Sequence, residues 1–283
     1  MANLLDGRAL GTEMRAELRA DVQRYVQQHG SPPGLVIVRV GEDAASGYYT
    51  RSILRTAKDI GVQADLKQLS EHATPDELRA ELRRSNEDAA THGIIVQMPL
   101  PAHLPQSIVA ETLSPAKDVD GISPVSAGHL LLGAPIFLPS TAAAVIEILE
   151  RSKIALEGKH AVVLGRSNVV GKPLAMLLLQ RNATVTICHS RTRDLASVTR
   201  QADILVVAIG RAQMVTAEMV RPGTTVIDVG INEKPGGGVV GDVDFASVSE
   251  VAGAITPTPG GVGPLTNVVL MKQCIQAAWQ QAN

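Results

Sequence analysis

The chain has 283 residues, of which 45% are apolar and 2% aromatic, and its formal net charge is −2. This length suffices for two domains with buried cores, whereas the balanced charge and few aromatic side chains disfavour a nucleic-acid-binding surface. No apolar run reaches the roughly 18 residues of a membrane span, and the start lacks the pattern of a signal peptide. Because Cys188 and Cys274 are too few for a disulfide framework, we expect a reducing compartment and a cytoplasmic protein.

The first half of the chain alternates helical and strand patterns. Apolar residues recur at every fourth position from Leu10 to Val26, which predicts a helix that ends at Gly30. The following patterns predict a strand at 35–40, a helix at about 44–60, an edge strand at 62–69, an amphipathic helix at 75–89 with Thr74 as its N-cap, and a buried strand at 93–97. This order predicts a parallel sheet with right-handed crossovers.

The chain between Pro99 and Pro139 is rich in Pro and Gly and less regular. A second α/β unit follows from about Pro139 to Val251, with strands at 161–164, 185–188, 204–208 and 225–229. A last helix, from about 267 to 282, is expected to pack back on the first unit. We therefore expect an α/β fold with two domains. The seven histidines are scattered without ligand spacing, so no metal site is expected.

The stretch Lys159–Pro173 is the most informative, because it predicts a strand, a tight turn and the start of a helix. Gly165 ends the apolar run, and Gly171 and Pro173 open the helix. Such a turn points backbone N–H groups and the positive end of a helix at one place, which suits a phosphate group. The pattern is G-x-S-x-x-x-G rather than the usual G-x-G-x-x-G, so a plain strand-to-helix connection remains the alternative.

The next strand ends in a basic sequence, His189-Ser190-Arg191-Thr192-Arg193, without a carboxylate before Asp194. In dinucleotide-binding folds an acidic residue at this place selects NAD, whereas a basic site accommodates the 2′-phosphate of NADP. Arg166, in the glycine turn, adds a second positive charge. The sequence therefore favours NADP over NAD, and the alternative is a solvated basic loop.

A second unusual segment is Thr256–Thr266, which is rich in glycine and proline. It predicts a stiff loop that offers bare backbone to a flat ligand, with a structural turn as the alternative. Open α/β sheets bind ligands outside the carboxyl ends of their strands. Three further segments occupy such places, namely Gly41–Tyr49, Gln97–Pro101 and Lys117–Gly121.

The chain resembles the methylenetetrahydrofolate dehydrogenase/cyclohydrolase family in the motifs VGEDAASGYY, GIIVQMPLP, KDVDGI, VLGRSNVVGKP, CHSRT, VVGDVDF and TPTPGGVGPLT. The resemblance implies NADP-linked oxidation of 5,10-methylenetetrahydrofolate to the methenyl form, followed by hydrolysis to 10-formyltetrahydrofolate. It implies a folate/catalytic domain of residues 1–138 plus 268–283, a Rossmann-like NADP-binding domain of residues 139–267, and a folate cleft between them. It also implies a homodimer formed through the NADP-binding domains.

The resemblance assigns candidate residues by their positions in these motifs. The expected catalytic residues are Tyr49, Gln97 and Asp120, and the last of these suits the paired donors of the pterin edge. The expected substrate-binding residues are Tyr49, Gln97, Pro99, Asp120, Gly260 and Gly261. The expected cofactor-binding residues are Gly165, Arg166, Ser167, Gly171, Ser190, Arg191 and Ile231.

One position departs from the family in a way that bears on chemistry. The family has a Lys one helical turn after the Tyr, and this chain has Ile53 there. That Lys is tied to the cyclohydrolase step, which needs proton transfers, whereas hydride transfer needs mainly positioning. Further departures, expected around the same cleft, are His92, Ser126, Ser140, Ala142 and Leu265.

The departures predict a dehydrogenase whose cyclohydrolase activity is weak or absent. Two other hypotheses remain open. One is a paralogue that has kept the NADP site but acts on a different small substrate. The other is a catalytically silent binding or regulatory protein, although retention of Tyr49, Gln97 and Asp120 argues against it.

Overall fold

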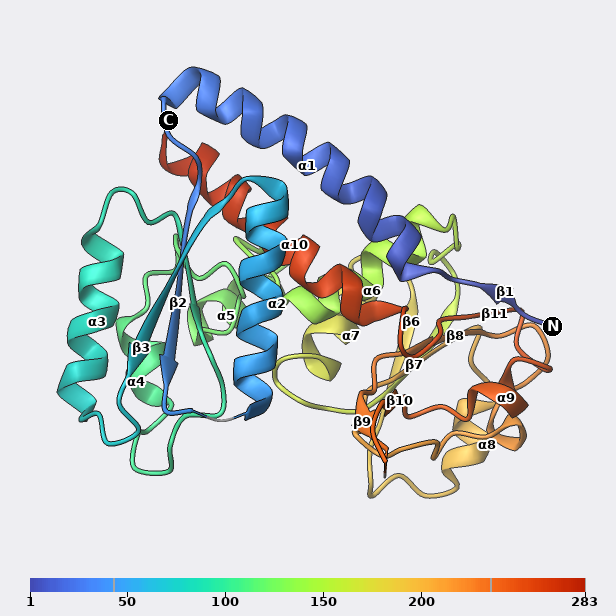
Figure 1. Ribbon diagram of the computed structural model, residues 1–283. Coiled ribbons are helices and arrows are strands. Elements are labelled where there is room, and N and C mark those ends of the chain that lie inside the picture. Colours follow the sequence, from blue (N-terminus) through green and yellow to red (C-terminus); the bar gives the residue numbers. More distant parts are fainter. Residues whose placement is uncertain (43, 235, 283) are drawn as a thin grey trace. The chain divides into compact units, whose positions relative to one another are not determined.

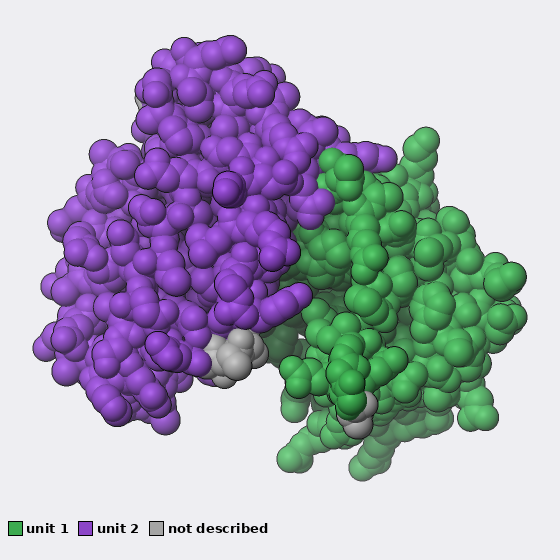
Figure 2. Space-filling view, in the orientation of Figure 1, with its two compact units in different colours: residues 1–12, 139–266 green, residues 13–138, 267–283 purple. Residues whose placement is uncertain are grey.

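The computed structural model describes residues 1–42, 44–234 and 236–282, so Asp43 of the Gly41–Tyr49 segment lies outside the described residues. The chain divides into two compact units, shown in Figure 2. One comprises residues 1–12 and 139–266, and the other residues 13–138 and 267–283. Each unit has its own parallel sheet.

The unit of residues 13–138 and 267–283 is built on a three-stranded sheet (Figure 1). Its strands are β2 (Gly34–Val40), β3 (Gln63–Leu69) and β4 (Gly93–Val96), all parallel, with β2 in the centre and β3 at one edge. Val36, Val38 and Val96 face one side of the sheet and pack on α3 (Pro75–Glu87) and α4 (Ser107–Thr112). The expected strands and helices of this half are therefore confirmed.

Local signals explain how three helices begin or end. Thr74 caps α3, because its hydroxyl oxygen accepts the backbone N–H of Glu77 at 3.2 Å while the Glu77 carboxylate accepts the backbone N–H of Thr74 at 2.7 Å. Helix α1 (Gly7–His29) stops before Gly30, whose φ of 78° few other residues adopt. Helix α5 (Pro124–Leu131) begins with a proline whose missing N–H would have lacked a partner.

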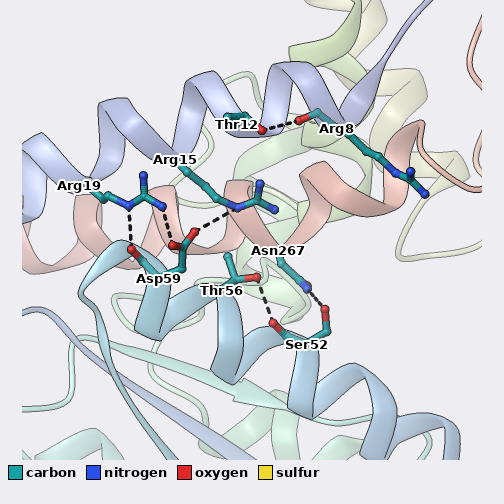
Figure 3. Close-up of polar contacts among 8 residues, drawn as sticks. All are labelled: Arg8, Thr12, Arg15, Arg19, Ser52, Thr56, Asp59 and Asn267. Atoms are coloured by element: carbon teal, nitrogen blue, oxygen red, sulfur yellow. Dashed lines mark hydrogen bonds and ion pairs between the residues drawn. The ribbon is translucent and has the colours of Figure 1, made fainter.

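Helix α2 (Ala44–Ile60) is tied to two other helices of its unit, as Figure 3 shows. At its carboxyl end, Asp59 makes ion pairs with Arg15 and Arg19 of α1. In its middle, the Ser52 hydroxyl accepts a hydrogen bond of 2.9 Å from the side chain of Asn267 in α10 (Val262–Gln281). These contacts fix the helix that carries Tyr49.

The unit of residues 1–12 and 139–266 is built on a six-stranded sheet in the order β1-β11-β8-β7-β5-β6, with every pair parallel. The strands are β1 (Asn3–Leu4), β5 (His160–Leu164), β6 (Thr184–Cys188), β7 (Ile204–Val207), β8 (Thr225–Asp228) and β11 (Ala254–Ile255). The other elements are α6 (Ser140–Arg151), α7 (Gly171–Leu179), α8 (Leu195–Thr199), α9 (Phe245–Val248), a 3₁₀ turn (Ala217–Met219), and the hairpin β9 (Asn232–Glu233) with β10 (Val239–Val240).

Three sequence-based expectations are corrected by the structure. Residues 1–12 belong to the second unit rather than to the first, because β1 pairs with β11 and the Leu5 N–H donates to the Ile255 carbonyl at 2.9 Å. The stretch 99–139 holds helices α4 and α5. The glycine-rich loop ends at Gly261, since α10 starts at Val262 and takes Pro264 in its first turn, where a missing N–H costs nothing.

Candidate active site

Tyr49 and Asp120 lie close enough for their charges to interact. Tyr49 stands in α2 and is partly buried. Burial, followed by the Asp120 carboxylate, raises the pKa of the Tyr49 phenol well above its ordinary value near 10. Tyr49 is therefore a neutral phenol at physiological pH. It can donate a hydrogen bond and is a poor base.

The turn that presents Asp120 is anchored on both sides. Asp118 is fully buried, and its carboxylate accepts the backbone N–H groups of Ile122 and Ser123 at 3.1 and 2.9 Å. The Lys117 ammonium donates to the Asp88 carbonyl at 2.8 Å, and burial lowers the pKa of this ammonium. Asp120 is the partly exposed carboxylate of this turn. Within the motif Lys117–Gly121, Lys117 and Asp118 therefore hold the backbone in place, and Asp120 is the acidic group that remains accessible to a ligand.

Gln97 and Pro99 follow β4 at its carboxyl end. Gln97 is buried, and its backbone N–H donates to the Val38 carbonyl at 2.9 Å, which extends the β2–β4 pairing by one residue. The Met98–Pro99 peptide bond is cis, and Pro99 is exposed. The carboxyl ends of β2 and β4 lie on the same edge of the sheet, so Gln97 and the start of α2 share that edge.

Arg39, the single charged residue of β2, is a neighbour that the sequence-based predictions did not include. Arg39 follows Val38 in β2, and Gln97 follows Val96 in β4. Since Val38 pairs with Val96, Arg39 and Gln97 occupy neighbouring positions on adjacent strands. Its Nε donates to the Ser46 hydroxyl at 3.1 Å, and Gly47 leaves room for its guanidinium. Arg39 therefore braces the first turns of the helix that carries Tyr49. A lone Arg near the end of an otherwise apolar strand is the signal that points to such a role.

Ile53 is fully buried, with 0% of its surface exposed. It stands one helical turn after Tyr49 on α2, so both residues lie on one side of that helix. The position thus contributes an apolar group to the core of the unit.

Two other departures from the family pattern have structural partners. Ser126 donates its hydroxyl to the Asp118 carboxylate at 2.6 Å and so strengthens the frame around Asp120. His92 accepts the backbone N–H of Gly34 at 2.9 Å and lies 3.1 Å from the Tyr25 hydroxyl. Since Gly34 opens β2 and His92 precedes β4, His92 lies at the amino-terminal edge of the sheet. The expectation that it surrounds the candidate site is therefore wrong.

In the other unit, the turn after β5 brings two glycines into close contact with backbone. A Cβ atom on Gly165 would lie 2.2 Å from the Ala208 carbonyl oxygen, and one on Gly171 would lie 2.2 Å from the Gly165 carbonyl oxygen. Gly165 also has a φ of 132°. The Ser167 hydroxyl accepts the backbone N–H of Val170 at 3.1 Å, and Arg166 is exposed. The turn leads into the N-terminus of α7, as the sequence predicts.

The turn after β6 presents Ser190 and Arg191 to solvent. His189 shapes it, because its backbone N–H donates to the Thr192 hydroxyl at 2.9 Å while its Nδ1 accepts the backbone N–H of Arg191 at 3.1 Å. The β5 and β6 strands are parallel neighbours, so this turn and the Gly165 turn leave the same edge of the sheet. The exposed hydroxyl and guanidinium groups of these two turns, one of which leads into a helix N-terminus, fit the phosphates of a dinucleotide.

Ile231, Gly260 and Gly261 belong to the same unit as these turns. Ile231 follows β8 and is 65% exposed. A Cβ atom on Gly263, in the first turn of α10, would lie 3.8 Å from the Ile231 side chain. A Cβ atom on Gly261 would lie 2.7 Å from the Pro257 carbonyl oxygen, so the loop requires glycine there.

The structure thus brings the expected residues together in two groups. Tyr49, Gln97, Pro99 and Asp120 belong to one unit, whereas the expected cofactor residues belong to the other with Gly260 and Gly261. Across residues 1–42, 44–234 and 236–282, no group of three or more metal-ligating side chains is present. No helix in that part of the chain is long and apolar enough to cross a membrane.

Comparison with known proteins places these observations in a family. The model of the tetrahydrofolate dehydrogenase/cyclohydrolase catalytic domain matches residues 5–120, and that of its NAD(P)-binding domain matches residues 139–282. Bifunctional protein FolD of Streptococcus agalactiae is 48% identical over 278 residues, with 98% of each chain covered. Bifunctional protein FolD of Herpetosiphon aurantiacus is 50% identical over 277 residues, with 98% of this chain and 97% of the relative covered.

Solved structures agree with these sequence matches. The bifunctional FolD enzyme of Campylobacter jejuni is 40% identical and superposes with a TM-score of 0.96 over 99% of both chains. The Trypanosoma brucei FolD, solved with NADP and an inhibitor, is 36% identical with a TM-score of 0.95 over 100% of this chain and 99% of that one.

The fold and its turns define an α/β protein with a dinucleotide-binding unit and a second parallel-sheet unit. The chain belongs to the tetrahydrofolate dehydrogenase/cyclohydrolase family.

Proposed function

We propose that this protein is an NADP-dependent 5,10-methylenetetrahydrofolate dehydrogenase whose cyclohydrolase step is weak or absent. The observation that carries the proposal is the closeness of Tyr49 to the Asp120 carboxylate, on a helix whose next turn carries the fully buried Ile53. The chain keeps the groups that would bind and orient a folate. At the position of the family Lys it has a side chain that cannot carry a proton.

The oxidation makes few demands on this unit. The methylene carbon loses one hydrogen with its bonding electron pair, and the product is the methenyl cation. When bound, NADP supplies the hydride acceptor. Tyr49, Gln97 and Asp120 would hold the folate so that this carbon faces the acceptor. The Asp120 carboxylate also suits the paired N–H donors of the pterin edge.

The residues that would hold the cofactor fit its chemistry. The N–H groups at the start of α7 and the Ser167 hydroxyl suit the pyrophosphate. Arg166, Ser190 and Arg191 are exposed and suit the 2′-phosphate that distinguishes NADP from NAD. The relatives named above support this assignment, since one of them was solved with NADP.

The hydrolysis makes a different demand. Water adds to the methenyl carbon and loses one proton. The remaining hydroxyl proton then leaves as the carbonyl forms, and the bond from the carbon to N5 breaks while N5 gains a proton. These proton transfers need groups that titrate near neutral pH. Tyr49 stays neutral because its pKa is raised, and Ile53 offers no ammonium. The hydrolytic step is therefore expected to be slow.

Separate measurement of the two steps tests the proposal. Reduction of NADP by methylenetetrahydrofolate is followed at the reduced-nicotinamide absorbance band, and loss of the methenyl product at its own band. We expect the first signal and no acceleration of the second over buffer. Rapid enzymatic loss of the methenyl compound would contradict the proposal. Absence of both activities would favour a paralogue with another substrate.

The chain is also expected to form a homodimer through its NADP-binding unit. Strand β6 is an edge strand of the six-stranded sheet, and Ile187 on it is 37% exposed. Leu179 at the end of α7 is more exposed still. An edge strand with apolar side chains is a surface that proteins cover. Sedimentation of the chain and of Ile187→Lys tests this assignment, and a monomeric unmodified chain would remove it.

A further inference from the structure

A pair of buried carboxylates occupies the NADP-binding unit beyond the residues assigned above. Asp228 ends β8 and is 4% exposed, and Asp242 follows β10 and is 0% exposed. Asp228 lies in a segment that the sequence predicted only as a strand, and Asp242 lies in the family motif VVGDVDF. Two carboxylates at such depth need strong hydrogen bonds to be tolerated.

Asp242 accepts four hydrogen bonds. One oxygen accepts the backbone N–H groups of Ile209 at 2.7 Å and Gly210 at 2.9 Å. The other accepts the backbone N–H of Arg211 at 2.7 Å and the side-chain N–H of Asn232 at 2.9 Å. The carboxylate therefore fills a nest of N–H groups from two different segments.

Asp228 in turn fixes the backbone around Asp242. Its carboxylate accepts the N–H of Asp242 and that of Val243, each at 3.0 Å. The contact is so close that a Cβ atom on Gly241 would lie 1.7 Å from an Asp228 oxygen, and one on Gly230 would lie 2.2 Å from the Asp242 carboxyl carbon. The two glycines are thus required by the pair, and the pair acts as one unit.

The two segments held by Asp242 flank the candidate cofactor residues. The Ile209–Arg211 segment follows β7, the direct neighbour of β5, and the preceding Ala208 carbonyl lies against Gly165. Asn232 is the residue after Ile231. The Asp242 carboxylate thus connects the segment that packs against the Gly165 turn with β9, which begins directly after Ile231.

We propose that Asp242 is a positioning residue for the dinucleotide, which holds the Ile209–Arg211 segment and the Ile231–Asn232 segment together at the cofactor edge of the sheet. The proposal rests on the proposed function, because NADP is the ligand whose affinity it concerns. If the pair served only the stability of the fold, any equally destabilising change would affect NADP binding alike.

The direct variant is Asp242→Asn, which keeps the shape but replaces one accepting oxygen by a donor that faces other donors. Two of the four hydrogen bonds are then lost, and the expected result is a rise of about 10-fold or more in the Kd of NADP. The KM of methylenetetrahydrofolate should stay close to that of the unmodified protein. NADP affinity is measured by titration without folate, so the result does not depend on turnover.

A milder variant covers the case in which Asp242→Asn does not fold. Asn232→Ala removes one of the four donors to Asp242 from a partly exposed position, together with a longer hydrogen bond of 3.5 Å to the Val240 carbonyl. A rise of roughly threefold to 10-fold in the NADP Kd is expected from loss of the bond to Asp242. Asn86→Ala is the matched control. The Asn86 side chain ties two segments of the other unit, because it donates to the Thr112 carbonyl and accepts the Ser114 N–H.

The comparison of these two variants decides the proposal. Asn86→Ala should lower the melting temperature as much as Asn232→Ala does while leaving the NADP Kd unchanged. Equal NADP affinity in Asn232→Ala and the unmodified chain would overturn the proposal and leave the proposed function intact. An unmodified chain that binds no NADP would instead remove the proposed function, and the present proposal with it.

Discussion

Replacement of Ile53 by Lys tests the proposed loss of hydrolysis in the restoring direction. The new ammonium would stand one helical turn from Tyr49, in a position that is now fully buried. An ammonium that loses its water is expected to have a depressed pKa, and a value near neutrality would suit proton transfer to a folate nitrogen. We therefore expect Ile53→Lys to gain cyclohydrolase activity.

The stability penalty follows from the same burial. A shift of the lysine pKa from about 10.4 to about 7 corresponds to roughly 4 to 5 kcal/mol of the free energy of unfolding. This is a large part of the about 5–15 kcal/mol that typical domains possess. Saturating NADP would offset some of it, by about 2.7 kcal/mol at a hundred times its Kd.

The sign of the pH dependence makes this estimate testable. Because the folded-state pKa is depressed, the unfolded chain binds the proton more tightly between about pH 7 and pH 10, so the variant should gain stability as pH rises through that window. Urea unfolding at several pH values measures this gain. The control is Ile53→Met, which has a similar length, carries no amine and is expected to cost less than about 1.5 kcal/mol at any pH.

The reasoning fails if Ile53→Met and Ile53→Lys behave alike in either assay. Equal hydrolysis by the two variants would mean that the amine plays no part in the step. A flat pH profile of unfolding for the Lys variant would mean that its ammonium reaches solvent. Hydrolysis by the unmodified chain at the rate of the Lys variant would show that another group acts in its place.

Three further changes have defined outcomes. Arg191→Ala should weaken NADP by about 10-fold in a fluorescence titration, since a charge-assisted hydrogen bond to the 2′-phosphate is lost, while NAD affinity stays the same; equal losses for both dinucleotides would contradict the assignment. Burial, and to a smaller extent the Asp242 charge, raises the pKa of Asp228 from 3.8 to about 6. Because folding therefore favours the neutral form of Asp228, the contribution of this group to the free energy of unfolding falls by about 3 kcal/mol between about pH 4 and pH 7. Urea unfolding of Asp228→Asn should lack that fall relative to the unmodified chain, and parallel profiles would refute it. Thr74→Ala should lower the free energy of unfolding by about 1 kcal/mol through loss of the capping box, without a change in NADP affinity.

Elements with strong periodicity were predictable from the sequence. The bounds expected for α2 match the structure because its apolar positions recur at helical spacing and Gly61 follows it. The strands β5 to β8 were recognisable as short apolar runs between turn residues. In contrast, β1 and β11 have two residues each, too few for any period, and their pairing joins opposite ends of the chain.

The candidate site shows the same contrast. The glycine turn and the basic end of β6 follow from local chemistry, so the sequence alone predicted them. The closeness of Tyr49 and Asp120 followed only from the family resemblance, because no local pattern connects a helix with a distant turn. Asp242 escaped notice because a carboxylate directly after a glycine normally indicates a solvated loop, whereas this one is buried among N–H donors.

The place of β1 has a consequence for synthesis of the chain. Asn3 pairs with Ala254, so β1 finds its partner only after the long stretch of chain between the two strands has been made. At about 5–20 residues per second, this interval lasts on the order of 10 to 50 s. Strands β5 to β8 lie close together in the sequence and can assemble during that time. Strand β1 then joins the edge of a sheet whose other strands formed without it, so a strand that is made early docks late.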